Sequence, residues 1–219
     1  MIVMASGAHR PRRQKTFPGR CHANPIGLRE EMTVRVAPAE IVSFWREAGP
    51  DKWFEHDDSF DQAIRLRFLP TYEAAANGKL AAWEESVEGA LALVLLLDQF
   101  PRNMFRGDAR AFATDVLARA VADRALARGL DQATDLTLRP FFYLPFMHSE
   151  ALTDQDRSVR LYQALGEAEE LRYATEHRDI VQRFGRFPHR NRALVRDTTP
   201  AEQAFLEADG FESPRNHSL

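Results

Sequence analysis

Basic and amide side chains gather near the end of one predicted helix, where they could bind an anion. On a helical wheel of residues 177–191, His177 falls on the apolar arc, and Asp179 falls on a separate polar arc. Arginine forks match phosphate and carboxylate groups, so the donors of this segment can converge on one ligand. The candidate ligand-binding residues are Arg183, Arg186, His189, Arg190 and Asn191. Alternatively, these side chains form structural pairs between helices, and Asp179 with Arg183 is a surface ion pair.

A carboxylate and two arginines follow the most apolar stretch of the chain. Asp98 comes directly after the run from Ala90 to Leu97, so we expect it to be at least partly buried. A buried carboxylate needs a cationic partner, and Arg102, Arg106 or an arginine of 183–190 could supply one. Arg102 and Arg106 are therefore added to the ligand-binding candidates. Asp98 is then either a general base positioned by arginines or half of a structural clasp.

His148 and Glu150 are the other acid–base candidates, and with Asp98 they complete the proposed catalytic set. No metal is expected. His148 with Glu150, and His177 with Asp179, are two residues apart, a spacing that does not place a pair on one helix face. The chain contains no zinc-protease motif, phosphate loop or dinucleotide fingerprint, so no cofactor is expected either. Cys21 is the single cysteine, which excludes an intrachain disulfide.

Similar sequences at 97–103 (LDQFPRN) and 183–191 (RFGRFPHRN) suggest duplicated helical hairpins. A Phe-Pro pair is expected to stop a helix at each site. Further helices are expected over 108–128, from a capping box at Thr153 to Gly166, over 167–187, and from Thr199 to Gly210. No alternating pattern of five or more residues predicts a strand. The sequence predicts an all-α fold of antiparallel hairpins, in which the aromatic residues of 141–146 and Trp45, Trp53 and Phe54 are expected to pack in the core.

Composition limits the domain organisation and the class of partner. The 219 residues carry a net charge of −3, so neither nucleic acid nor an acidic membrane surface is an expected partner. Residues 1–31 hold six Lys or Arg against two Glu and are expected to form a disordered basic extension, with Met32 as the natural start. A single all-α domain is expected over 32–212, followed by a tail at 213–219. A cytoplasmic location is expected because no secretory signal is evident.

Several long motifs in order resemble the bacterial domain-of-unknown-function 924 family. The resemblance covers about residues 36–212 and implies an all-helical, tetratricopeptide-like fold. The family pattern is Pro-Phe-Glu-His-Ser-Glu, and here Met147 stands in place of the first glutamate. Any role of that carboxylate is lost here or passes to Glu150. The motifs that carry the resemblance are IVSFWREAGPDKWF at 41–54, LLLDQFPRNMFRG at 95–107, RPFFYLPFMHSE at 139–150 and HRDIVQRFGRFPHRN at 177–191.

Two classes of function remain open. In the first, a polar pocket binds an anionic small molecule, with or without catalysis, and the two basic segments meet the 148–150 segment in it. In the second, the protein is an interaction scaffold that holds a peptide or protein partner in a groove between helical hairpins. Polar residues bunch at predicted helix ends rather than along helix faces, and this favours the pocket.

Overall fold

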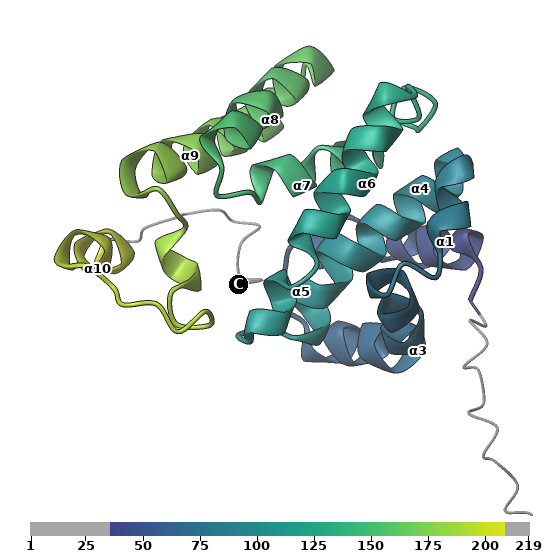
Figure 1. The fold of residues 1–219 in the computed structure, drawn as a ribbon, viewed down its shortest axis with the longest axis horizontal. Coiled ribbons are helices and arrows are strands. Elements are labelled where there is room, and N and C mark those ends of the chain that lie inside the picture. Colours follow the sequence, from purple (N-terminus) through teal and green to yellow (C-terminus); the bar gives the residue numbers. More distant parts are fainter. Residues whose placement is uncertain (1–35, 209–219) are drawn as a thin grey trace, which may run out of the picture. The chain divides into compact units, whose positions relative to one another are not determined.

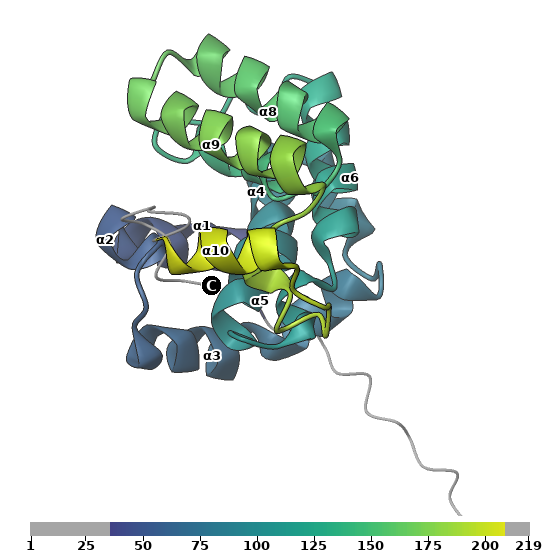
Figure 2. The ribbon, with the colours of Figure 1, turned by 90° about the vertical axis from the view of Figure 1, so that its left-hand side faces the viewer.

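The computed structural model describes residues 36–208, all of which belong to one compact unit. This part of the chain is all helical, as predicted, and contains no strand. The tetratricopeptide-like arrangement stays a prediction, as do the extension over 1–31 and the tail over 213–219, which lie outside the described residues. Figures 1 and 2 show the order of the helices. Their bounds are α1 Pro38–Ala48, α2 Pro50–Trp53, α3 Asp58–Ala76, α4 Val87–Val94, α5 Phe100–Met104, α6 Asp115–Ala127, α7 Leu144–Met147, α8 Leu152–Leu165, α9 Ala168–Phe184 and α10 Pro200–Glu207.

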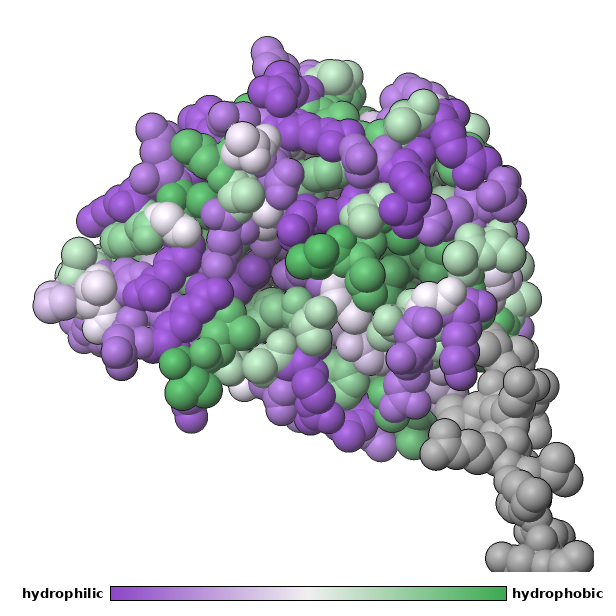
Figure 3. All heavy atoms as spheres, in the orientation of Figure 1, coloured by the Kyte–Doolittle hydropathy of each residue, from purple (hydrophilic) through white to green (hydrophobic). Residues whose placement is uncertain are grey.

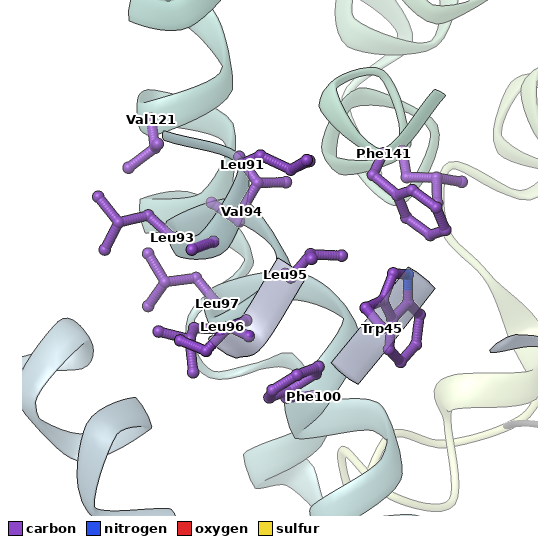
Figure 4. Close-up of a cluster of buried hydrophobic side chains, with 14 of the residues drawn as sticks. Trp45, Leu91, Leu93, Val94, Leu95, Leu96, Leu97, Phe100, Val121 and Phe141 are labelled. Atoms are coloured by element: carbon purple, nitrogen blue, oxygen red, sulfur yellow. The ribbon is translucent and has the colours of Figure 1, made fainter. Parts of the chain in front are cut away.

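Helix α4 lies at the centre of the N-terminal part and is buried on nearly every side. It contacts α1 and α6, while α3 packs against α5 (Figure 1). Figure 4 shows the leucines of this region beside Trp45, Phe100 and Phe141, which are almost inaccessible to solvent. The ring of Trp45 lies 5.6 Å from the rings of both Phe100 and Phe141. This apolar cluster fixes the α4 region against the segment that begins at residue 139.

A π-helical turn, Leu95–Gln99, joins α4 to α5 without interrupting the helical path. The prediction that Phe100-Pro101 stops the helix is therefore wrong. The Phe100 N–H donates to the Leu95 carbonyl, five residues earlier, and Pro101, which has no N–H to donate, follows directly after this wider turn. The wide turn also contains Asp98, which is completely buried.

Three other predicted helix boundaries are wrong. Residues 108–128 are split into a short 3-10 turn, Ala109–Phe112, and α6, because Asp108 caps the turn through the Arg110 N–H. Helix α8 begins at Leu152 without a side-chain cap, so the predicted box at Thr153 does not form. Helix α9 ends at Phe184 because Gly185 adopts a left-handed conformation, with a φ of 71°.

The C-terminal helices form a hairpin and a final segment. Helices α8 and α9 run side by side in both views and are connected through Gly166, which has a φ of 86° (Figures 1 and 2). A 3-10 turn, Pro188–Arg190, follows α9 and contacts α10. Thr199 caps α10 in a capping box with Glu202, at the start predicted for this helix. The connections place His148, which follows α7, close to both α9 and the π turn.

Candidate functional site

The centre of the candidate site is a hydrogen bond between Asp98 and His148. The Nδ1 atom of His148 lies 2.9 Å from one Asp98 carboxylate oxygen and 3.0 Å from the other. Gln99 Nε2 donates to the same carboxylate at 2.5 Å, and Arg102 Nη1 lies 3.4 Å from it. The structure therefore brings together two of the three predicted catalytic residues, and the π turn supplies the buried carboxylate.

Local charges and burial set the protonation of this pair. Burial alone raises the pKa of Asp98, but the Arg102 charge and the contact with His148 outweigh it and hold that pKa below its usual range. Burial lowers the pKa of His148, and the nearby Arg102 guanidinium lowers it further. At neutral pH a neutral His148 faces an ionised Asp98, so Nδ1 carries the proton that Asp98 accepts. The other ring nitrogen, Nε2, is then a hydrogen-bond acceptor.

His148 lies in the wall of a cavity of about 340 Å³. The cavity is partly open to solvent, and the His148 side chain is 15% exposed. Because Nδ1 is turned to Asp98, the Nε2 side of the imidazole is the edge available to a molecule in the cavity. The rest of the wall is mostly apolar and comes from Pro50, Trp53, Phe54, Leu136, Thr137, Pro140, Phe141, Leu144, Met147, Tyr162, Glu167, Glu170, Tyr173 and His177.

His177 also lines this cavity, on the predicted apolar side of α9. Its Nδ1 lies 2.7 Å from the Tyr173 carbonyl, which can only accept, so Nδ1 carries the proton. Burial lowers the pKa of His177 to about 3. The rings of His148 and His177 are 6.5 Å apart, so two neutral imidazoles lie on the same side of the cavity.

Glu150 lies apart from the Asp98–His148 pair. It binds Arg196 through two hydrogen bonds of 2.8 Å and accepts the Phe187 N–H at 3.0 Å. Burial tends to raise the pKa of Glu150, but these partners lower it overall. Glu150 lies between α7 and α8, and its contacts therefore join this segment to the segment that follows α9. Glu150 does not border the cavity.

The arginines predicted to hold an anion are engaged with groups of the protein itself. Arg102 binds Asp115 through hydrogen bonds of 3.0 and 3.1 Å, and Arg106 binds Asp61 in the same two-pronged way. Arg186 binds Glu202 at 2.6 and 2.8 Å. These contacts correspond to the structural alternative considered for the sequence, in which the arginines hold helices together.

The remaining candidates are distributed around the turn that follows α9. Arg190 donates to the His148 carbonyl at 3.0 Å and lies over the rings of Phe112 and Phe187. Arg183 lies over the rings of Phe184 and Phe205. Asp179 pairs with Arg178 rather than with Arg183, so the predicted surface pair between Asp179 and Arg183 is wrong. The last two candidates are His189, stacked on Phe187, and the buried Asn191, which bonds Thr198.

One trio of metal-ligand types occurs within residues 36–208, away from the cavity wall. Ligand atoms of His56, Asp58 and Asp61 lie within 4.8 Å of one another. Asp61 already binds Asn103 and Arg106, and His56 binds Asp58. These contacts account for the trio without an ion.

Most of the cavity wall was not predicted from the sequence. Trp53, Phe54 and Phe141 were assigned to the core, and each indeed packs against other rings, but each also borders the cavity. Glu167 and Glu170 at the start of α9 received no role. The signal available in the sequence was the density of aromatic residues, which does not distinguish a core from a binding wall.

Fold and site together define an all-α protein with an aromatic-walled cavity and a buried Asp–His pair beside it. The chain belongs to the family described as bacterial protein of unknown function (DUF924), which it matches over residues 41–210. It is similar to the solved structure of the protein of unknown function ATU0120 from Agrobacterium tumefaciens. The identity is 55%, the TM-score is 0.76, and the match covers 78% of this chain and 97% of that one. No curated protein matches the chain. Within residues 36–208, none of the helices combines the length and apolar character needed to span a bilayer.

Proposed function

We propose that this protein binds a small molecule in the cavity beside His148, with a polar group of the ligand donating a hydrogen bond to His148 Nε2. One observation carries the proposal: the same imidazole contacts buried Asp98 through Nδ1 and borders a cavity of about 340 Å³. Cavities of this size with apolar walls and few polar groups are typical of small-molecule sites.

The Asp98–His148 pair also suits proton transfer. A histidine held by a carboxylate keeps one tautomer and can take a proton on its free nitrogen, while the carboxylate stabilises the imidazolium that forms. Here the N–H or O–H bond of the ligand would break, and the proton would move to His148 Nε2. This chemistry would make the protein an acid–base catalyst, and ligand binding is its first requirement.

The anionic ligand predicted from the arginines would use a different set of contacts. It would have to displace carboxylates from Arg102, Arg106 or Arg186, each of which is bound in a two-pronged pair. A peptide-binding scaffold would instead use a long groove. On the face that Figure 3 shows, apolar side chains reach the surface in several patches separated by polar ones. The cavity therefore supports a compact ligand better than either alternative.

The test is a thermal-shift screen of the full chain against phenylethanol, phenethylammonium, phenylpropionate and inorganic phosphate. A ligand that binds only the native state raises the melting temperature by mass action. We expect at least one phenyl compound to stabilise the wild type and the His56→Gln variant, but not the His148→Gln variant. His56 is a matched control because it also contacts an aspartate, at 2.9 Å, but is exposed.

Two outcomes would overturn the proposal. One is the absence of any shift with all three phenyl compounds, together with no change in the intrinsic tryptophan fluorescence, to which Trp53 in the cavity wall contributes. The other is a shift that His148→Gln leaves unchanged in a variant that keeps the wild-type circular dichroism. A phosphate shift that Arg186→Ala and Arg190→Ala both abolish would favour the predicted anion site instead.

A further inference from the structure

The backbone that carries His148 is held at three successive carbonyl groups. The Nε2 atom of Gln155 donates to the Met147 carbonyl and to the Ser149 carbonyl, in both cases at 2.6 Å. Arg190 Nη1 donates to the carbonyl of His148 itself at 3.0 Å. Carbonyls at the end of a helix have no partner within that helix, and α7 ends at Met147. The donors that they need come from α8 and from the turn after α9.

The Gln155 side chain can face these carbonyls in only one way. Gln155 is inaccessible to solvent, so no bulk water competes for its amide. A carbonyl oxygen only accepts hydrogen bonds, so the NH2 end of the amide must point to Met147 and Ser149. Each of the two N–H bonds then has its own acceptor. The amide therefore fixes the spacing of the carbonyls on the two sides of His148.

Arg190 restrains the peptide that follows His148. The Arg190 guanidinium lies 4.7 Å from the ring centre of Phe112 and 4.6 Å from that of Phe187. Its Nη1 atom is 3.6 Å from an Asp115 carboxylate oxygen, and the residue is buried. Because Arg190 is itself fixed by these contacts, the hydrogen bond to the His148 carbonyl limits how far that carbonyl can turn.

The position of this backbone decides whether the His148 ring reaches both of its neighbours. Nδ1 lies 2.9 Å from Asp98, and the same ring borders the cavity. A hydrogen bond weakens steeply when its length and angle depart from the optimum, so a small displacement of the backbone is enough to weaken this contact. Gln155 does not border the cavity, and it can therefore affect a ligand there only through His148.

We propose that Gln155 is a positioning residue of the cavity site. Its amide holds the His148 backbone so that Nδ1 meets Asp98 and Nε2 faces the ligand, and Arg190 is the second support. The inference rests on the proposed function, since it concerns the imidazole to which the ligand donates. Without the amide the segment shifts and the contact with Asp98 lengthens. His148 then adopts the Nε2–H tautomer that predominates in a free imidazole side chain, and the ligand meets a donor in place of an acceptor.

Nitrogen-15 NMR of the full chain reads the His148 tautomer directly, because protonated and unprotonated ring nitrogens differ widely in chemical shift. At pH 7 without ligand, we expect the Nδ1–H tautomer in the wild type and the Nε2–H tautomer in Gln155→Met. Methionine is as long as glutamine but has no donor. The matched control is Gln163→Met, at an exposed glutamine of the same helix, which should keep Nδ1–H. Gln155→Asn, whose shorter side chain cannot bond both carbonyls, provides the same test if Gln155→Met does not fold.

Two probes connect the tautomer to ligand binding. Phenylethanol carries a hydroxyl donor, and ethylbenzene has the same apolar body without it. Isothermal titration of the full chain gives both dissociation constants. We expect Gln155→Met to weaken phenylethanol about tenfold, as the loss of one hydrogen bond would, and to change ethylbenzene by less than about twofold. Gln163→Met should change neither, whereas a general loosening of the fold would weaken both probes alike.

The outcomes separate this inference from the proposed function. An unchanged His148 tautomer in a folded Gln155 variant would overturn the inference and leave the cavity site standing. Equal weakening of phenylethanol and ethylbenzene by Gln155→Met would also overturn it. Failure of the wild type to bind either probe would overturn the proposed function, and the tautomer, which is measured without ligand, would still decide whether Gln155 holds His148.

Discussion

Asp98 and His148 are 50 residues apart in the chain, yet their side chains meet at 2.9 Å. Asp98 belongs to the π turn between α4 and α5, and His148 follows α7, so this contact joins two separately formed segments. The contact also determines which imidazole nitrogen can reach the cavity. Any weakening of it is therefore expected to affect stability and ligand binding together.

A double-mutant cycle measures the strength of this contact. We expect Asp98→Asn and His148→Gln to show a coupling free energy of about 1–3 kcal/mol, as expected for a buried hydrogen bond to a charged group. Urea unfolding of the wild type, both single variants and the double variant gives the value. Strictly additive effects would mean that the two side chains do not support each other.

Replacing Arg102 by Met is expected to cost about 3–5 kcal/mol of unfolding free energy, because Asp98 and Asp115 would remain buried without their shared cation. Arg183→Met, at an exposed position over two rings, should cost about 1 kcal/mol or less. Both arginines were candidates for an anion site. Equal stability of the two variants in urea unfolding would contradict a structural role for Arg102.

The unfolding free energy should fall as the pH falls below about 6.5, partly because of His177. The unfolded state takes up a proton on this residue near its ordinary pKa, whereas the folded state takes it up only near a pKa of about 3. His177 thus removes about 1.4 kcal/mol of stability per pH unit within that window.

The His177→Gln variant should therefore show a shallower decline, measured by urea unfolding at about pH 7 and about pH 5. Identical slopes for wild type and His177→Gln would show that the folded protein protonates His177 as readily as the unfolded chain does.

Gly89→Ala should destabilise the protein by about 1–3 kcal/mol, although alanine favours helices over glycine. A Cβ at Gly89, in the first turn of α4, would overlap the backbone carbonyl of Trp83 and press on Ser86. A backbone carbonyl cannot rotate away as a flexible side chain can. Glu88→Ala in the same turn is the control, and a gain in melting temperature for Gly89→Ala would show that the contact yields.

Residue pattern was sufficient for the fold class and for the burial of Asp98. The apolar run before Asp98 predicted that it is buried, and its charge predicted a cationic partner, which is Arg102. Local spacing could not identify His148 as the other partner, because that contact depends on tertiary packing. The π turn was also not predicted, because a Phe-Pro pair such as Phe100-Pro101 is compatible with either the end of a helix or a π turn.

The cavity was not predictable for a different reason. Phe141 contacts Trp45 in the core and also borders the cavity, so a single ring serves both environments. Sequence periodicity assigns each residue to one face of a helix, so it cannot show that one side chain contacts both the core and a cavity. The partners of Glu150 and Arg186 could not be predicted from sequence periodicity either. Arg196 and Glu202 come close to them only through the turn after α9.

The π turn also has a consequence for aligning relatives of this chain. A π turn accommodates one more residue than an α-helical turn, so each residue after it is displaced by about 100° around the helix axis. A relative with a regular helix here would need a one-residue gap within 95–99. Aligned without that gap, its arginine at the position of Arg102 would point to a different neighbour despite being identical in the alignment.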